Sequence, residues 1–433
     1  MMRTYDSYKD SEIEWIGEIP RHWESSKLKY DVLLVMGQSP DSDNYIDIDN
    51  GNPFLQGNTE FGLTYPSNNK WTKQVTKMTK IGDLLYSVRG SLGEMNWSDK
   101  EYCIGRGLCG IRPIYLDKKY TFYLFLTLKE EIKSIGVGST FLSISTDDLK
   151  NLFYFKPPLT EQEQIVSYLD EKTSLIDEMV EKKKRKIELL KEYRTSLINT
   201  VVTKGLNPDV PMKDSGIEWI GEIPRHWVVG RLKHLLIEKP DNGLFKRKEE
   251  FGNGVKFVNV SNLFNYNNKV DVESLERVSV SNIELDKSGL EDGDIFFVRS
   301  SLKLEGIGVS SIVDRVEEPI VFDCHIIRIK SDKSKIVPNY LISLLNSQSY
   351  RTYLISVSET VTMTTISQDK IKDMVFYYPP LPEQEQIVSY LDEKTSEIDK
   401  IIELENKKIE LLKEYRQSLI SNVVTGKIKV VSE

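Results

Sequence analysis

A cysteine and a histidine stand next to each other at Cys324-His325, within the run VFDCHIIRI. Thiolate and imidazole are the ligands that zinc prefers, so metal binding is the first chemistry to consider here. The flanking residues are apolar, as expected for a buried strand. The chain holds only 4 histidines, and its 3 cysteines, Cys103, Cys109 and Cys324, have no paired spacing. A buried strand is therefore the favoured interpretation, and we expect no metal site.

Two other histidines, His22 and His226, lie near the ends of identical stretches, EWIGEIPRHW. Histidine is the most frequent general base in enzymes, but neither stretch indicates a nucleophile or a carboxylate partner. The chain also has no phosphate loop, nucleophile elbow or kinase motif set. Its Pro-Pro pairs follow Lys156 and Tyr378, rather than the Asn or Asp of amino-methyltransferases. We expect a structural role for both histidines and no catalytic site.

Polar side chains gather instead in loops of two variable segments. Residues 82–91 read as a Gly-Asp turn, a strand and an arginine followed by small residues, and residues 293–301 have the same pattern. Both segments close on hydroxyl-rich runs, at 139–145 and 362–368. These runs lead directly into a long repeated element, which must position the loops.

The long repeated element spans Pro157–Thr203 and, in nearly the same sequence, Pro379–Thr425. Each copy has the periodicity of one helix of about 40 residues, roughly 60 Å long. Thr160 and Glu163 form a capping-box pattern at the first start, and Pro382 suits the first turn of the second. Gly205 and Gly426 stand where C-terminal caps are expected.

Apolar residues in each copy recur on alternating steps of four and three, which is the pattern of a coiled-coil seam. Lys183 and Arg194 complete the series in the first copy, and Glu405 and Arg416 in the second. Because the two seams match, we expect the helices to pack on each other rather than each within its own domain. The apolar seam residues are Ile176, Val180, Ile187, Leu190, Leu197, Val201, Ile398, Ile402, Ile409, Leu412, Leu419 and Val423.

A short repeat precedes each variable segment, at Lys9–Trp23 and Lys213–Trp227, and it differs only at Glu12 and Gly216. We interpret it as an apolar clip that packs near the base of the helices. The order clip, variable segment, long helix therefore occurs twice. The predicted boundaries are 1–23 for the first clip, 24–156 for the first domain, 157–205 for the first helix, 206–227 for a linker and second clip, 228–378 for the second domain, and 379–433 for the second helix and tail.

The composition of the 433 residues is that of an ordinary soluble protein, with 39% hydrophobic and 29% charged residues. No apolar run is long enough to cross a membrane, and the N-terminus lacks the apolar stretch of a signal peptide. The unpaired cysteines favour a reducing, cytoplasmic location. The net charge of −8 argues against nucleic-acid binding, which usually leaves a basic footprint.

The arrangement nevertheless resembles the specificity subunits of type I restriction–modification systems. The resemblance rests on the P-P-L-x-E-Q-x-x-I helix starts, the E-W-I-G-E-I-P-x-H-W openings, the G-D loops that end in arginine, and the I-S-x-x-x-[LI]-K runs before the helices. It covers nearly the whole chain. The helix starts and openings are fairly specific, whereas each loop motif is weak alone.

The resemblance implies an α+β fold. It consists of two mixed α/β target recognition domains separated by an antiparallel coiled coil of the two long helices, in a pseudo-two-fold arrangement. Each domain would read one half of a bipartite site on double-stranded DNA. The subunit would have no activity or cofactor of its own. It would assemble with two methyltransferase subunits, which use S-adenosylmethionine, and two motor-nuclease subunits, which use ATP and Mg.

Arginine suits guanine edges and Asn or Gln suits adenine edges in the major groove, so polar loop residues are the candidate base readers. Any one of them could equally be a turn or surface residue. The candidates are Gln56, Asn58, Arg89, Ser91 and Arg106 in the first domain, and Lys256, Asn259, Asn262, Arg299, Ser301, Lys303 and Thr364 in the second. Since the inserts are close to neutral, we expect methyltransferase subunits to supply much of the phosphate contact.

Two other functions remain open on the sequence alone. The chain could be an adaptor without enzymatic activity, built on an antiparallel coiled coil, whose inserts bind proteins. It could also be an enzyme with an unrecognised nuclease site. Sequence-specific protection of a split DNA target would favour the specificity subunit over both.

Overall fold

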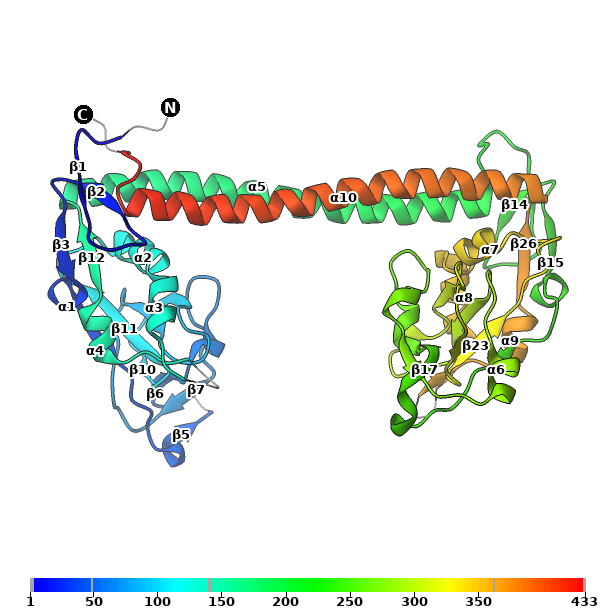
Figure 1. Cartoon of the computed structure of the whole chain (residues 1–433), viewed down its shortest axis with the longest axis horizontal. Helices are drawn as coiled ribbons and strands as arrows, with labels where there is room; N and C mark the ends of the chain where they lie inside the picture. The colour runs from blue at the N-terminus through cyan, green and yellow to red at the C-terminus, as the bar shows by residue number, and fades with distance from the viewer. Residues whose placement is uncertain (1–3, 48–49, 139–141, 361–362, 431–433) are drawn as a thin grey trace. The chain divides into compact units, whose positions relative to one another are not determined.

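The computed structural model describes residues 4–47, 50–138, 142–360 and 363–430. Residues 139–141 and 362 of the two hydroxyl-rich runs lie outside this description. The chain divides into two compact units. The first comprises residues 1–184 and 406–433, and the second residues 185–405. Each unit contains one clip, one mixed domain and one half of each long helix (Figure 1).

The first unit holds two four-stranded sheets. One has the order β4-β11-β8-β9 and is antiparallel throughout; the other has the order β10-β6-β7-β5 and pairs β10 with β6 in parallel. Their strands are β4 Val32–Met36, β11 Leu108–Pro113, β8 Leu84–Ser87, β9 Met95–Trp97, β10 Cys103–Ile104, β6 Asn52–Leu55, β7 Lys70–Thr72 and β5 Tyr45–Ile46. The helices α1 Leu28–Asp31, α2 Lys118–Thr127, α3 Lys129–Ile135 and α4 Thr146–Asn151 accompany these sheets.

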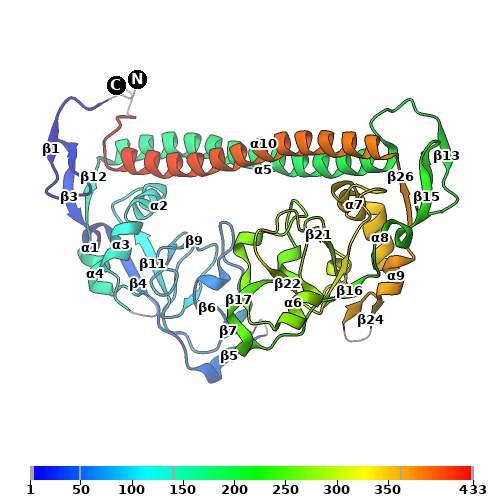
Figure 2. The same cartoon turned by 45° about the vertical axis from the view of Figure 1, so that its right-hand side comes forward.

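The second unit repeats this plan and adds to it (Figure 2). The sheet β16-β23-β19-β21 corresponds to the first sheet above, and β18-β17-β22 to the second; the small sheet β20-β25-β24 stands where the first unit has the isolated bridges Arg89–Ser143 and Val137–Ser143. The strands are β16 Asp241–Asn242, β23 Ile326–Ile329, β19 Ile295–Val298, β21 Ser310–Ile312, β18 Glu276–Val278, β17 Phe251–Val258, β22 Ile320–Phe322, β20 Ser300–Ser301, β25 Thr364–Thr365 and β24 Glu359–Thr360. Its helices are α6 Asn282–Ser288, α7 Pro338–Leu345, α8 Gln348–Ser356 and α9 Gln368–Lys372.

Each clip is a hairpin followed by a strand that pairs with the strand before the long helix. The hairpins are β1 Tyr8–Asp10 with β2 Glu18–Pro20, and β13 Met212–Asp214 with β14 Glu222–Pro224. The flanking pairs are β3 Glu24–Lys27 with β12 Phe153–Lys156, and β15 Val228–Arg231 with β26 Val375–Tyr378. Each mixed domain is therefore closed at its base by its own first and last strands.

The long helices are α5, Leu159–Lys204, and α10, Leu381–Val424. Thr160 is the second residue of α5, so the predicted capping box does not mark the helix start. Pro382 lies in the first turn of α10 as expected. Gly205 and Gly426 follow the helices with φ of +77° and +75°, the left-handed conformation that favours glycine at a C-terminal cap.

Within each unit, part of α5 packs against part of α10 in antiparallel sense. In the first unit, Arg416 Nε lies 2.9 Å from Asp177 Oδ1, and in the second, Arg194 Nε lies 3.1 Å from Asp399 Oδ1. These residues occupy the same places in the two copies of the repeat. The same contact therefore recurs with the roles of the two helices exchanged. Every residue of the predicted seam is buried or half-buried.

The clips pack where one long helix ends. In the first unit, the buried Trp23 shares an apolar cluster with Val423 and Val424 of α10. In the second, the buried Trp227 shares one with Val201 and Val202 of α5. Apolar burial of such large side chains is the main stabilising term available to a clip this short. The predicted place of the clips near the base of the helices is thus confirmed.

Candidate nucleic-acid interface

In the first unit, three connections meet at one edge of the sheets. The turn 105–107 between β10 and β11 is hydrogen-bonded to Ser39 after β4, to the last residue of β6 and to the segment that follows β8. Gly105 N donates to Leu55 O (2.8 Å), and Val88 N donates to Gly107 O (2.9 Å). A Cβ on Gly37 would lie 2.1 Å from Gly105 O, so only glycine permits this approach.

Four of the predicted base readers project from this edge. Gln56, Arg89, Ser91 and Arg106 are exposed, while Asn58 is half-buried at the start of a 3₁₀ turn. Among the described residues, neither arginine has an ion pair or a side-chain hydrogen bond. Two free guanidinium groups on neighbouring loops can bind guanine edges or phosphates. The structure thus brings together residues that lie far apart in the sequence.

The second unit builds the same edge with the same backbone bonds. Asp323 N donates to Val258 O (3.0 Å), and Arg299 N donates to His325 O (2.8 Å). The turn 323–325 therefore takes the place of turn 105–107, and Cys324 takes the place of Arg106. The same two backbone hydrogen bonds therefore hold turns with different side chains.

The two arginines that follow the Gly-Asp turns do not share a position. Val88 N makes the bond in the first unit that Arg299 N makes in the second. Arg89 bridges to Ser143, whereas Ser300 pairs with Thr365. Arg89 comes six residues after Asp83, whereas Arg299 comes five residues after Asp294. Our expectation of a shared place is therefore wrong by one residue, which sends the two side chains to opposite sides of the strand.

Several candidates of the second unit have structural partners within the chain. Lys256 Nζ lies 2.9 Å from Glu318 Oε1 and 3.7 Å from Glu273 Oε2. Asn259 Oδ1 accepts from Val260 N (2.8 Å), and Asn262 Oδ1 accepts from Asn259 N (2.8 Å), so both asparagines cap their own turn. Local capping is the ordinary role of asparagine in such turns.

The remaining candidates of the second unit lie together around β20. Arg299 is half-buried and its Nη1 donates to Cys324 O (3.3 Å). Thr364 is buried and shares a hydrogen bond of 3.0 Å with Thr360, and Ser301 Oγ donates to Lys303 O (2.7 Å). The ammonium group of Lys303 is exposed and has no ion pair among the described residues. Lys303 is thus the candidate of this unit most open to a ligand.

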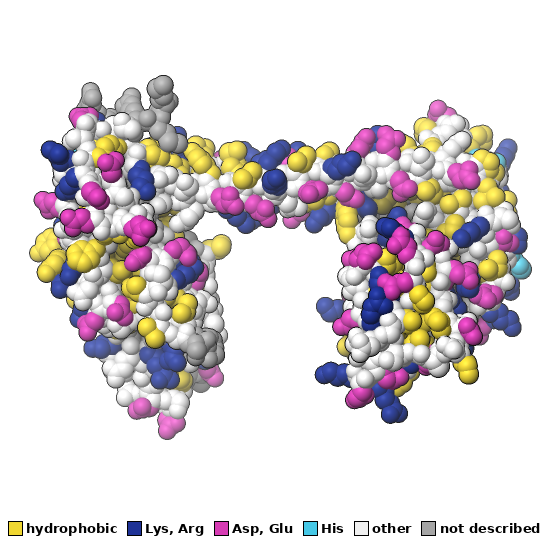
Figure 3. Space-filling model, in the orientation of Figure 1, with side chains coloured by type: hydrophobic (Ala, Val, Ile, Leu, Met, Phe, Trp, Pro, Cys, Tyr) yellow, Lys and Arg dark blue, Asp and Glu magenta, His cyan; other side chains and the backbone are white. Residues whose placement is uncertain are grey.

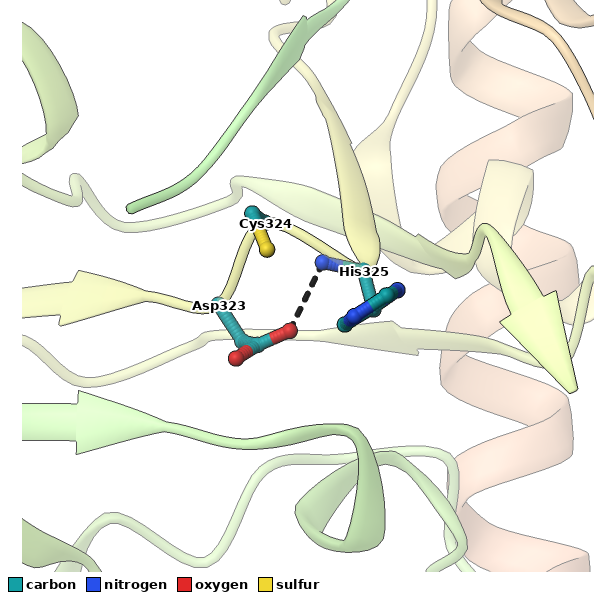
Figure 4. Close-up of side chains that lie close together, drawn as sticks. All are labelled: Asp323, Cys324 and His325. Carbon is teal, nitrogen blue, oxygen red and sulfur yellow. Dashed lines mark hydrogen bonds between the residues drawn. The ribbon is translucent and has the colours of Figure 1, made fainter. Parts of the chain in front are cut away.

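Asp323, Cys324 and His325 offer a carboxylate, a thiol and an imidazole within 4.8 Å of one another (Figure 4). The carboxylate already accepts a hydrogen bond from His325 N (2.7 Å), which closes the turn. Burial raises the pKa of the Cys324 thiol, which disfavours the thiolate that a metal needs. The Arg299 guanidinium beside Cys324 adds a fixed positive charge. These contacts suit a turn in the interface better than a metal site.

The Gly-Asp turns differ in how their carboxylates are held. Asp83 accepts two hydrogen bonds from the guanidinium of Arg112, at 2.8 and 2.7 Å. Asp294 lies 3.6 Å from Arg328, whose guanidinium binds Asp241 at 3.0 and 2.7 Å. Burial raises the pKa of Asp294 to about 6. The Gly-Asp motif therefore occurs in both units, but its carboxylate is paired closely with an arginine in the first unit and has a raised pKa in the second.

The two histidines of the clips contact the first turn of the following helix. His22 Nε2 lies 2.9 Å from Glu161 Oε2, and His226 Nε2 lies 2.7 Å from Glu383 Oε2. One residue further along the helix, Gln162 Nε2 donates to Pro157 O (2.9 Å). Both histidines thus have a carboxylate partner, which we did not expect from the sequence, and these contacts join each clip to the start of the following helix.

Charged side chains of both signs are interspersed over the visible face of each unit (Figure 3). The face drawn there shows no broad basic field of the kind that draws DNA by charge alone. Recognition by a few free cations and polar groups on the loops remains compatible with it. The described helices include no stretch with the length and hydropathy of a membrane span.

Comparisons with known proteins agree with this architecture. Residues 20–189 and 224–414 match the family described as "Type I restriction modification DNA specificity domain". A putative type I restriction enzyme MjaX specificity subunit from Methanocaldococcus jannaschii is 36% identical over 204 residues, 46% of this chain and 46% of that protein. The chain thus matches about half the length of this relative.

Two further proteins are similar over nearly the full chain. The type I restriction enzyme MjaIX specificity subunit of the same organism is 25% identical over 441 residues, covering 96% of this chain and 95% of that protein. A chain from a solved structure concerning complex assembly and conformational transition of the type I R-M system has a TM-score of 0.72 at 15% identity. It covers 94% of this chain and 98% of that one, which supports the fold.

Proposed function

The chain belongs to the family of type I restriction modification DNA specificity proteins, and on that premise we propose that it reads a bipartite DNA target, with one half-site for each unit. The observation that carries this proposal is the repeated loop edge. Both units build it with the same backbone hydrogen bonds, yet Arg106 in one corresponds to Cys324 in the other. A shared frame with different side chains is what recognition of two unlike half-sites requires.

Direct readout in the first unit rests on Arg89 and Arg106 in this proposal. Both are exposed, and arginine binds the O6 and N7 atoms of guanine with two parallel hydrogen bonds. Gln56 stands beside them and suits an adenine edge. Its carbonyl accepts from Lys70 Nζ at 3.4 Å, a weak contact that DNA can displace.

The long helices set the spacing between half-sites in this proposal. A helix of 46 residues is roughly 69 Å long at 1.5 Å per residue. Half-sites one helical turn of DNA apart are about 34 Å between centres, so a helix pair of this length can span them. The contacts of Asp177 with Arg416 and of Asp399 with Arg194 show that each unit holds its parts of the two helices in the same way.

The catalytic work would belong to partners. We infer assembly with methyltransferase subunits that use S-adenosylmethionine and with motor-nuclease subunits that use ATP and Mg. The interspersed surface charges support this division, because a chain with a net charge of −8 supplies little of the phosphate contact on which DNA affinity depends.

Genome-wide mapping of methylated adenines tests this function. The chain is expressed with the methyltransferase subunits of its own system in a host that lacks them. We expect methylation at one split sequence, and its loss when the specificity chain is omitted. Assembly with the methyltransferase but no sequence-specific methylation would favour a protein-binding adaptor, and cleavage by the isolated chain would reveal an enzyme.

A further inference from the structure

The second unit contains a hollow of about 580 Å³ beside the loop 299–308. Apolar side chains form much of its wall, among them Val260, Phe264, Leu302 and Met363. Leu302 is 85% exposed and Phe264 is 52% exposed. Exposed apolar surface next to a hollow is a mark of ligand contact rather than of folding.

The corresponding loop of the first unit, 88–93, is shorter, and its Leu92 corresponds to the buried Ile307 of the second unit, because each precedes a glycine whose N–H donates to the preceding strand. Leu92 is only 4% exposed and belongs to the apolar core. Both loops begin at the same backbone bond, made by Val88 N in one unit and Arg299 N in the other. The exposed Leu302 therefore lies in the longer loop of the second unit in addition to the buried residue that both loops share.

The hollow is continuous with the loop edge described above. Its rim includes Ser300, Ser301 and His325, which belong to the loops that meet there. Lys303 also lines it, with an ammonium group that can reach a phosphate. Of the lining residues, Glu305 alone is acidic. A ligand with an apolar group close to a polyanionic backbone fits these surroundings.

We propose that this hollow takes the 5-methyl group of a thymine in the half-site read by the second unit. The inference rests on the proposed DNA-reading function and specifies the base. In the major groove, adenine, guanine and cytosine present polar edges, and the thymine methyl is the apolar feature. Leu302 and Phe264 would contact the methyl group, while Ser300, Ser301 and Lys303 contact neighbouring polar and phosphate groups.

Deoxyuridine substitution tests this contact, because uracil lacks only the methyl group of thymine. The chain is assembled with its methyltransferase subunits and bound to a duplex that carries its mapped target. Each thymine of both half-sites is replaced by deoxyuridine, one at a time. We expect one replacement to weaken binding about fourfold, the effect of removing one buried methyl-sized group.

Two leucines of the same loop provide a matched pair of variants. Leu302 lines the hollow, whereas Leu304, which is 48% exposed, does not. We expect Leu302→Ala to reduce the deoxyuridine effect below twofold and Leu304→Ala to leave it unchanged. Both side chains are exposed, so neither variant should alter folding.

Distinct results separate this inference from the function on which it rests. In one result, the complex binds its target specifically while Leu302→Ala changes the effect of none of the deoxyuridine replacements. That result would overturn the thymine contact and leave bipartite recognition intact. Loss of methyltransferase assembly in Leu302→Ala, with the deoxyuridine effect retained, would assign the hollow to a protein contact and also overturn it. Absence of sequence-specific binding by the wild-type complex would contradict the proposed function itself.

Discussion

The two units share a frame and differ in what the frame presents. The first unit offers two free arginines on short loops, whereas the second offers a longer loop with an exposed leucine and a turn of Asp323, Cys324 and His325. The clips, the flanking strand pairs and the helix contacts are nearly the same in both. The difference shows that position and chemistry are encoded separately: repeated sequence sets the position, and divergent loops set the chemistry.

The largest expected effect is on the free energy of unfolding, and it concerns Arg328 and Arg112, which contact the aspartates of the Gly-Asp turns. The side chain of Arg328 is 4% exposed and that of Arg112 is 26% exposed. Arg328→Ala leaves Asp241 and Asp294 without their cation, and breaking a buried pair costs about 3–5 kcal/mol. Arg112→Ala should cost less, because Arg112 holds the single carboxylate of Asp83, whereas Arg328 lies between two carboxylates and also donates to Gly289 O. Urea unfolding of both variants measures the difference, and equal losses would contradict the contrast.

The next prediction concerns the part that the units share. Leu190 and Leu412 occupy the same place in the two repeats, and both are half-buried. Leu190→Asp and Leu412→Asp each place a charge in the seam, and each should lower stability by about 3 kcal/mol. Thermal unfolding and assembly with the methyltransferase are the measurements. Unchanged melting in both variants would show that the helices do not pair through this face.

The pH dependence of stability should distinguish the second unit. Its Asp294 has a pKa raised to about 6, above the ordinary value near 3.9. The stability that the protonated Asp294 carboxyl contributes is therefore fully present below about pH 4 and is lost as the pH rises through 6. Relative to wild type, Asp294→Asn should gain stability between about pH 4 and 6, on the order of 2 kcal/mol. A constant difference across that range would rule out this titration.

The smallest effects are expected on target specificity, at the arginines of the loops that we propose to read DNA. Arg89→Ala and Arg299→Ala should each relax one half-site only, by about 1–3 kcal/mol for a lost bidentate contact. Because Arg299 Nη1 also donates to Cys324 O, its loss should lower stability as well, by about 1 kcal/mol. Methylation rates on single-base variants of the target measure the first effect. Normal rates and specificity in both variants would exclude these arginines as readers.

The sequence was sufficient to predict the scaffold. Duplicated clips and heptad seams revealed the two-fold repetition, because long repeats and sustained periodicity require no tertiary information. The seam residues Leu190 and Leu412 are found in the predicted helices, and the glycines that follow these helices have the expected conformation. The capping box at Thr160 was wrong, because the helix begins before it.

The loop edge that we propose as the DNA-reading surface could be predicted from the sequence only in part. Arg89, Arg106 and Gln56 were named from their loops, but their meeting depends on hydrogen bonds between distant strands. Lys256 looked available, although Glu318 and Glu273 pair with it. Leu302 was missed, because an apolar residue in a polar loop gives no signal until the hollow beside it is seen. Gly37 could have indicated the turn 105–107, because Gly105 O lies too close to position 37 for any side chain there.

An exchange of whole segments tests the separation of frame and chemistry most directly. Residues 24–156 are replaced by a second copy of residues 228–378, so that both units carry the same reading loops between unchanged clips and helices. The variant is expressed with its methyltransferase subunits, and methylated adenines are mapped across the genome. We expect a new target in which the second unit's half-site occurs twice as an inverted repeat. Methylation of the original asymmetric sequence by this variant would contradict the assignment of one half-site to each unit.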